Sequence, residues 1–564
     1  MAFINEATCF SGQIEDLLIS EGPEPLTDHA SLTLPFYPIT GITLLPPPAP
    51  KGYNVDAARQ EAWTTAFLAE LRSKGTADDL NTAISDLNEA IENASKNTLE
   101  PRRAPNPKGA SWWNKACTKA QTAARTATLG PGRKAANKNL QHVIVNAKRD
   151  WAHEKLDHAV DAGDIWALAK LRKGRQTNAF PPLRTPDNQL IDDPDDKAKI
   201  FQDKFFPANP VTVDASQLDN PPPTIPRHWT PITTLEVTNT LKTTTNSSAP
   251  GPSGVGYNIL KWAHVASPEV LTHIFNMSLF TGTHPWKHAT VVILNKPNKP
   301  NYSQAKAYRP ISLLECSAKL MEKIIAKRVN DDISRANLLS MLQFGSRPHH
   351  NAIDAIATLV HCIQATRLTG HAGALLLFDI AGFFNTVNPD RVTQIFRLKG
   401  FPTYICDWIH SFLTGRMVSL KMGTHISAPC DIHNGTPQGL PLSPILSAVY
   451  TAFLLDMSSW WSHKDLTMYV NDGAIYVVSA TTQAAVTSAL MGYKEVLCWL
   501  ASNGLSADLA KTELIMFMKP RANIDLTGGR IWGGCYADAQ AKHLNITTAT
   551  TVKYLGMYIS HDLK

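Results

Sequence analysis

Two acidic residues, far apart in the chain, accompany short apolar runs that are typical of buried strands. Asp379 ends the run 374–378, which predicts a strand that delivers a carboxylate to the edge of a sheet. Asp472 lies in an Asn-Asp-Gly sequence between two strand-like runs, a pattern that predicts a β-hairpin over 466–478. Carboxylates are the hard, charged ligands that Mg²⁺ prefers. Together the two acids indicate a magnesium site, although each pattern alone fits a plain strand end or a surface hairpin.

The segments around these residues resemble the motifs of one family, in that family's order and spacing. Tyr469-Val-Asn-Asp472 resembles the YxDD box of reverse transcriptases, and 379–384 resembles their first palm motif. Six further segments resemble the other motifs, from the turn before the fingers to the primer grip: 249–254, 307–314, 343–347, 435–444, 504–513 and 553–556. The chain therefore resembles a non-LTR (LINE-type) retrotransposon reverse transcriptase, with a fungal-like idiom, over about residues 236–560.

The resemblance implies RNA-directed DNA synthesis with an RNA template, a DNA primer and dNTPs as partners. It implies two Mg²⁺ ions, about 3.5–4 Å apart, that activate the primer 3′-hydroxyl and neutralise the leaving pyrophosphate. The implied metal ligands are Asp379 and Asp472. The residues implied in nucleotide binding are Arg309 and Lys296 (or Lys299) at the triphosphate, Phe384 as a steric gate under the sugar, and Gln438 with Gly439 at the nucleotide or template. The implied primer grip comprises Tyr554, Leu555 and Gly556.

One residue departs from the family pattern at the catalytic position itself. Asn471 stands where the family has the first aspartate of YxDD, the carboxylate that bridges both metals. An amide oxygen is neutral and its NH₂ group presents donors toward a cation. Losing one preorganised electrostatic group costs about 10²–10³ in rate, so we expect impaired activity. Weak ligation through the amide oxygen and deamidation to aspartate are the milder alternatives.

The resemblance implies an α/β (α+β) fold with right-hand fingers and palm, behind a basic region that the spacing of apolar residues predicts to be mainly helical. The expected parts are a possible C-terminal remnant of an endonuclease/exonuclease/phosphatase domain (1–40), a helical basic connector (41–180), a Pro-rich linker and helix (181–235), fingers and palm (236–520), and the end of the palm with the start of the thumb (521–564). Asp28 and His29 resemble the nuclease's terminal triplet, with Asp orienting a general-base His. We expect a chain truncated at both ends.

Charge is concentrated in one part of the chain. The formal net charge is +6, but residues 101–175 hold 16 Lys and Arg against 5 Asp and Glu, with tryptophans interleaved. This stretch fits either a solvated helical face or a nucleic-acid contact. A run of 18 apolar residues and a secretory signal are both missing, and the eight scattered cysteines lack metal-site spacing, so we expect an intracellular protein of the nucleus or cytoplasm.

Two other functions remain open at this point. The first is a catalytically inactive nucleic-acid-binding relic of the same element, holding RNA through 101–175 and the fingers. The second is a group II intron maturase, which shares the palm. The long tryptophan-rich connector and the nuclease-like segment argue against the maturase.

Overall fold

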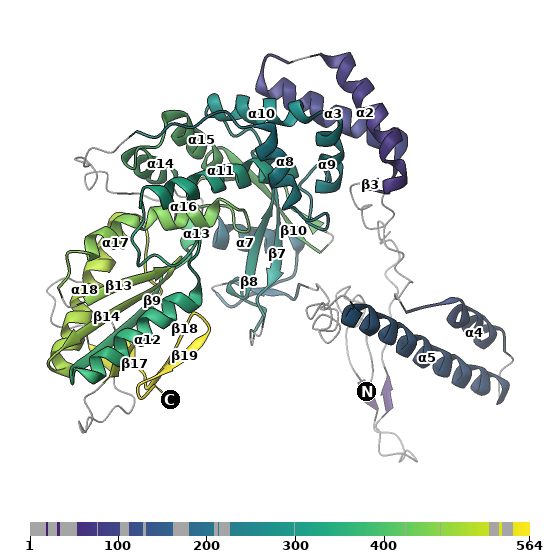
Figure 1. Ribbon diagram of the computed structural model, residues 1–564. Coiled ribbons are helices and arrows are strands. Elements are labelled where there is room, and N and C mark those ends of the chain that lie inside the picture. Colours follow the sequence, from purple (N-terminus) through teal and green to yellow (C-terminus); the bar gives the residue numbers. More distant parts are fainter. Residues whose placement is uncertain are drawn as a thin grey trace. The chain divides into compact units, whose positions relative to one another are not determined.

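The computed structural model forms two compact units, residues 1–49 and 50–564, which are described separately (Figure 1). The residues that it describes are 18–20, 31–33, 53–75, 77–101, 112–127, 131–161, 180–185, 187–207, 213, 226–297, 299, 301–423, 425–462, 464–517, 530–532 and 545–563. In the first unit, β1 (Leu18–Ser20) pairs antiparallel with β2 (Ser31–Thr33). The predicted nuclease residues Asp28 and His29 lie outside the described residues, so that prediction stays untested.

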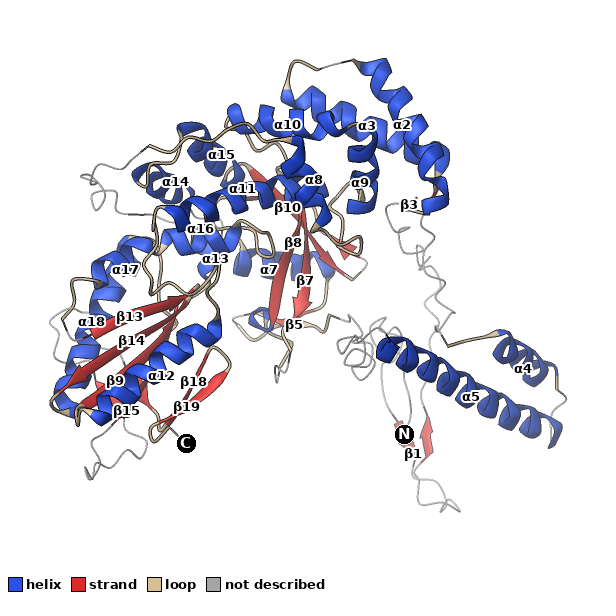
Figure 2. Cartoon of the chain, viewed as in Figure 1, coloured by secondary structure: helices blue, strands red, loops and turns tan. Residues whose placement is uncertain are grey.

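The larger unit contains a six-stranded sheet that carries both predicted acidic residues (Figure 2). Its strands, in spatial order, are β13 (Lys464–Tyr469), β14 (Asp472–Ser479), β9 (Ala372–Asp379), β15 (Glu513–Phe517), β17 (Asn545–Thr548) and β16 (Arg530–Trp532). Every position of β9 is buried, which confirms the predicted buried strand. All neighbouring strands pair antiparallel except β15 and β17.

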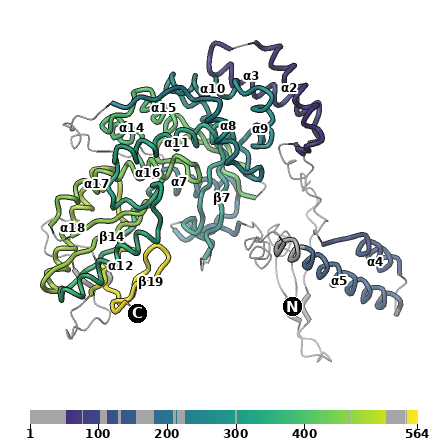
Figure 3. Tube along the Cα trace, in the orientation of Figure 1, coloured from purple at the N-terminus to yellow at the C-terminus, as the bar shows by residue number. Residues whose placement is uncertain are grey.

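Helices cover both faces of this sheet because the strand side chains alternate between two hydrophobic clusters. Leu376 and Phe378 belong to the large cluster with residues of α18 (Thr482–Ser502). Leu375 and Leu377 belong to a smaller cluster with residues of α12 (Ala352–Leu368). The smaller cluster also contains residues of the hairpin of β18 (Thr551–Tyr554) and β19 (Met557–Ser560), whose path is traced in Figure 3.

A second sheet lies within residues 236–520, the range predicted to form the fingers and palm. Its strands are β7 (His288–Asn295), β8 (Tyr308–Leu313), β10 (Arg416–Met422), β11 (His425–Ile426) and β12 (Cys430–Ile432). The order is β11-β10-β7-β8, and β12 pairs with β10. Helix α7 (Pro194–Phe205) contacts β10, and its Phe201 ring meets the Tyr308 ring edge-on at 5.0 Å. A short pair, β5 (Leu183–Arg184) with β6 (Leu190–Ile191), precedes α7.

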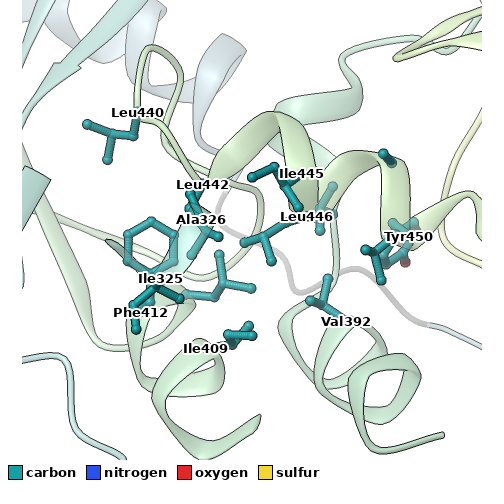
Figure 4. Packing of buried hydrophobic residues seen from close by; sticks show 14 of the residues in the cluster. Ile325, Ala326, Val392, Ile409, Phe412, Leu440, Leu442, Ile445, Leu446 and Tyr450 are labelled. Carbon is teal, nitrogen blue, oxygen red and sulfur yellow. The ribbon is translucent and has the colours of Figure 1, made fainter. Parts of the chain in front are cut away.

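A layer of helices connects the two sheets. It comprises α8 (Thr234–Lys242), α9 (Tyr257–Ala266), α10 (Pro268–Phe280), α11 (Cys316–Arg335), α13 (Phe383–Thr386), α14 (Pro389–Leu398), α15 (Thr403–Leu413), α16 (Ser443–Tyr450) and α17 (Ala452–Ser458). Figure 4 shows the centre of this layer, where α16 side chains pack among side chains of α11, α14 and α15: Ile325, Val392, Ile409, Ile445 and Leu446.

The N-terminal helices of the larger unit fall into two groups. Helices α2 (Gln60–Lys74) and α3 (Leu80–Thr98) pack against each other and against α9 and α10, and Trp63 lies 5.8 Å from the Trp262 ring. Helices α4 (Lys115–Thr126) and α5 (Pro131–Asp161) pack against each other. The mixed helix and sheet content confirms the predicted fold class. No helix in the described ranges is long and apolar enough to cross a membrane.

Candidate active site

The sheet register brings the two predicted acids face to face. β14 pairs antiparallel with β9, and the pairing places Asp472 directly opposite Asp379. Such partners have Cβ atoms about 4.5–5.5 Å apart, and like charges in this position repel each other. Asp379 is buried at the end of its strand, as predicted, and its backbone carbonyl accepts a 2.8 Å hydrogen bond from the Asp508 N–H. Two carboxylates therefore meet where β9 ends and β14 begins.

The predicted hairpin exists, but the prediction that its turn comprises Asn471, Asp472 and Gly473 is wrong. The turn residues are Val470 and Asn471, and Val470 has a positive φ of 61°. Gly473 lies inside β14, where an added Cβ would stand 2.2 Å from the Phe378 ring. This glycine is thus required for packing against the neighbouring strand, and the left-handed backbone falls on a valine, which rarely adopts it.

The side chain of Asp379 is held by two donors from different elements. The amide of Asn471 donates a hydrogen bond to Asp379 Oδ1, and the Lys511 ammonium forms an ion pair with Oδ2. Lys511 also lies 3.3 Å from Asp508. The backbone N–H of Ile380 donates to the Asn471 carbonyl at 2.9 Å, which fixes the hairpin tip to the end of β9.

Asp472 titrates differently from an ordinary aspartate. Burial, together with the negative charge of Asp379, raises its pKa to about 6, and the Lys511 ammonium opposes both effects. Desolvation and a like charge both favour the neutral form of a carboxyl group. The pair therefore stores repulsion that a bound cation would relieve.

The donor set at the acidic pair fits magnesium at two of its three positions. Asp379 and Asp472 supply hard carboxylate oxygens from facing positions, as Mg²⁺ requires. The third position, at Asn471, supplies only a neutral amide, and its NH₂ group points at Asp379. In the described part of the chain, no three or more His, Cys, Asp or Glu side chains are grouped to hold a metal ion. The residues fit a divalent cation, but they offer it less negative charge than a site with three carboxylates would.

The loop after β12 lies against the predicted sugar gate, Phe384, and contains the predicted nucleotide or template residues Gln438 and Gly439. The Thr436 N–H donates to the Phe384 carbonyl at 2.6 Å, and Gln438 Nε2 donates to Asn385 Oδ1 at 3.2 Å. Phe384 is half-buried in α13, directly after the strand that ends in Asp379. Gly439 has a φ of 94°, and an added Cβ would stand 3.3 Å from Ile311. The structure thus joins Phe384, Gln438 and Gly439 in one neighbourhood.

The predicted triphosphate residues lie in a region of positive charge. Arg309 is exposed on β8, and Lys296 Nζ donates to the Lys306 carbonyl at 2.9 Å. Burial lowers the pKa of Lys296, which is lowered further by the positive charges of Lys299, Arg309, Lys511 and Lys204. Mutual repulsion of this kind is relieved by an anion. Lys511, which links these cations to Asp379, belongs to the 504–513 motif but received no role from the sequence.

The predicted primer-grip residues form the turn of the last hairpin. Leu555 and Gly556 both have positive φ angles, 48° and 91°, between the paired residues Tyr554 and Met557. Burial raises the pKa of Tyr554 to about 12, and the charge of Asp472 contributes to the rise. The hairpin therefore lies near the acidic pair, while its role as a primer grip stays a prediction.

Residues 294–559 match the family described as reverse transcriptase (RNA-dependent DNA polymerase). A probable RNA-directed DNA polymerase from transposon BS of Drosophila melanogaster is 30% identical over 334 residues, which are 57% of this chain and 36% of that protein. The RNA-directed DNA polymerase from mobile element jockey of the same organism is 29% identical, over 48% of this chain and 30% of that protein.

One more distant similarity extends further along the chain. A putative 115 kDa protein in the type-1 retrotransposable element R1DM of Drosophila melanogaster is 24% identical over 74% of this chain and 38% of that protein. The solved structure of apo telomerase from Candida tropicalis aligns with a TM-score of 0.34 and 10% identity, over 55% of this chain and 66% of that chain. The chain spans about a third of the length of the three curated relatives. Residues 294–559 are thus similar to the reverse transcriptase domain of non-LTR retrotransposons.

Proposed function

We propose that the chain is the RNA-directed DNA polymerase part of a non-LTR retrotransposon, with activity impaired by Asn471. In the reaction, the 3′-hydroxyl of a DNA primer on an RNA template forms a phosphodiester bond with the α-phosphorus of a dNTP, and the bond to the β-phosphate breaks to release pyrophosphate. The observation that supports it is the register of β9 and β14, which places Asp472 opposite Asp379. The domain match and the retrotransposon relatives support the same chemistry.

The proposal gives each side chain near the acidic pair one task. Mg²⁺, when bound, would activate the primer hydroxyl and stabilise charge on the phosphates. Asp379 and Asp472 hold it. Arg309 and Lys296 bind the triphosphate, because their charges repel one another until an anion neutralises them. Phe384 lies under the sugar and excludes a 2′-hydroxyl by size.

Further contacts in the proposal involve the template and the primer. Gln438, oriented by Asn385, and Gly439, whose lack of a Cβ allows close approach, contact the nucleotide or template. The turn at Tyr554, Leu555 and Gly556 supports the primer. Asn471 lowers the rate because a neutral amide replaces a charge that this site needs, and because its donor group faces the cation position.

Primer extension by the full-length chain tests the proposal. A DNA primer annealed to an RNA template is supplied with dNTPs and Mg²⁺, and extension is measured under single-turnover conditions. Asn471→Asp should extend at least about 10²-fold faster than the wild type. Asp379→Asn in the same background is the control and should abolish the gain. An Asn471→Asp protein that binds primer–template without extending it would overturn the proposal.

A second candidate is a non-catalytic nucleic-acid-binding protein, and the basic helices favour it. Residues 132–149 of α5 contain five basic and no acidic residues. Lys148 lies 4.7 Å from the centroid of the Trp112 ring, so an aromatic side chain stands among these charges. Arg133, Lys134 and Lys138 are exposed on the same helix. Such a surface binds phosphates through counterion release, which weakens with salt.

RNA binding at increasing salt tests this candidate. The wild type should lose affinity between about 50 and about 200 mM salt with a slope of roughly 0.7–0.9 per phosphate contact. Replacing Arg133, Lys134 and Lys138 by Gln should reduce the slope by the amount that corresponds to about three phosphate contacts. Binding of this kind, without extension by Asn471→Asp, would favour the second candidate over the first. A slope that the triple change leaves alone would exclude α5 as the binding surface.

A further inference from the structure

A buried guanidinium holds the loop next to the proposed sugar gate. Arg416, the first residue of β10, is only 8% exposed. Its Nε donates to the Leu413 carbonyl at 2.9 Å, and one terminal nitrogen donates to the carbonyls of Asn434 and Gly435, both at 2.7 Å. All of these acceptors are backbone carbonyls, and two of them belong to the loop that precedes Gln438.

Burial of the Arg416 charge costs free energy in these surroundings. Burial lowers the pKa of Arg416 to about 10. Burial is the largest cause of the lowered pKa values of the neighbouring Lys287 and His284, and the positive charge of Arg416 lowers both further. A buried charge without a carboxylate partner is costly, so neutral residues would serve better if only packing mattered. Among the described residues, backbone carbonyls are the acceptors of the hydrogen bonds that Arg416 donates, and two of these three carbonyls belong to the loop.

The loop that Arg416 holds is hydrogen-bonded to the backbone around Phe384. The Gly435 N–H donates to the Val387 carbonyl at 2.7 Å, and the Thr436 N–H donates to the Phe384 carbonyl at 2.6 Å. These two bonds hold both ends of the short helix α13 that carries Phe384. Gly435 has a φ of 81°, and an added Cβ would stand 2.5 Å from the Phe384 carbonyl oxygen. The backbones of the loop and of α13 are therefore in direct contact.

We propose that Arg416 is a positioning residue that sets discrimination between deoxyribonucleotides and ribonucleotides. It fixes the carbonyls of Asn434 and Gly435, and the loop fixes the backbone of Phe384. The height of the Phe384 ring under the sugar then depends on a guanidinium that never touches the nucleotide. The inference rests on the proposed function, in which Phe384 is the gate.

The test compares dATP with ATP in an Asn471→Asp background of the full chain. The measured quantity is the ratio of kcat/KM for the two nucleotides on an RNA template with a DNA primer. Arg416→Lys keeps the charge but loses the two-carbonyl contact, and should lower the ratio by about tenfold or more, since small displacements of a positioned group have effects of this size. A purely structural defect lowers both efficiencies equally and leaves the ratio unchanged.

Two matched variants control for folding. Lys287→Met removes the neighbouring half-buried cation, whose side-chain hydrogen bonds go to Ser411 and Thr414 and not to the loop, and should leave the ratio unchanged. Gly435→Ala keeps Arg416 but pushes the loop away from Phe384, and should lower the ratio as Arg416→Lys does. If Arg416→Lys fails to fold, Gly435→Ala decides the matter.

The outcomes separate this inference from the proposed function. Phe384→Val should collapse the ratio, and an unchanged ratio would overturn the gate itself. A ratio that falls for Phe384→Val but not for Arg416→Lys or Gly435→Ala would overturn the role of Arg416 alone. Equilibrium binding of dATP and ATP to the complex with a chain-terminated primer gives the same comparison without turnover. The inference can therefore be tested even if Asn471→Asp does not extend primers.

Discussion

The side-chain amide of Asn471 donates a hydrogen bond to the carboxylate of Asp379, so the hairpin tip is fastened to the end of β9 by a neutral group. An aspartate at position 471 would instead place a third carboxylate beside Asp379 and Asp472. Like charges this close raise one another's pKa and destabilise the metal-free protein. Stability without metal and affinity for metal therefore make opposite demands on position 471.

Exchanging the amide for a carboxylate should reverse the response to magnesium. In EDTA, Asn471→Asp should be less stable than the wild type by about 1–2 kcal/mol, because one pKa unit of repulsion is worth about 1.4 kcal/mol. Saturating Mg²⁺ should then stabilise the variant by roughly 2.7 kcal/mol at 100 times Kd. Thermal unfolding with and without Mg²⁺ measures both effects. Asn471→Ala is the control, which loses the hydrogen bond and gains no response; equal stabilisation of the wild type by Mg²⁺ would contradict the prediction.

The acidic pair should make stability depend on pH in a defined direction. The pKa of Asp472 is raised from 3.8 to about 6 in the fold, so its contribution is complete below about pH 4 and is lost as the pH rises through 6. Lys511 opposes this rise, and Lys511→Met should enlarge the loss by up to about 1 kcal/mol, since Lys511 is largely exposed. Denaturant unfolding in EDTA at about pH 5 and about pH 7.5 measures the loss. Asp472→Asn should remove the Asp472 share of the loss in both backgrounds, and a Lys511→Met protein with the wild-type profile would refute the coupling.

Local patterns in the sequence predicted which elements exist, but they did not predict the register or the turn position of those elements. The apolar run before Asp379 and the turn signal before Gly473 predicted a buried strand and a hairpin, and both exist. The register that places Asp472 opposite Asp379 depends on pairing between distant segments, which no local pattern encodes. It became predictable only through the resemblance to a family. Lys511 and Arg416 were missed as individual residues because their partners lie on other elements.

The hairpin tip shows why local rules failed there. Turn propensities assign the positive φ to an Asn-Asp-Gly sequence, whereas the structure places it at Val470. Gly345 explains part of this choice, because an added Cβ there would stand 2.4 Å from the Val470 nitrogen. The tip is thus packed against another segment, and tertiary contacts override the local preference of a β-branched residue.

Gly473→Ala separates the packing role of this glycine from a turn role. The added methyl group would overlap the Phe378 ring, so we expect a loss of about 1–3 kcal/mol in the free energy of unfolding. Adding Phe378→Leu makes room and should recover part of the loss, beyond the cost of Phe378→Leu alone. Denaturant unfolding of the two single variants and the double variant forms the cycle. Strict additivity would show that Gly473 is needed for its backbone and not for its contact with Phe378.

A buried carboxyl group in α11 is the least expected feature of the helical layer. Glu322 is fully buried, and neither carboxylate oxygen has a hydrogen-bond partner among the described residues. Burial raises its pKa well above the ordinary value of 4.5. The folded protein therefore keeps a proton that the unfolded chain releases near pH 4.5. It follows that stability falls as the pH rises above that value, until the folded group also ionises.

Replacing Glu322 should stabilise the protein, most strongly at neutral pH. Glu322→Met removes both the titration and the unsatisfied polar atoms, and should gain about 1–3 kcal/mol near pH 7.5 and less near pH 5. Glu322→Gln is the matched control, because it removes the contribution of Glu322 to the pH dependence but leaves a buried polar group, so its gain should be smaller at every pH. Denaturant unfolding across this pH range measures all three proteins. A destabilised Glu322→Met, with Glu322→Gln unaffected, would instead mean that a polar group at this position is needed by the fold.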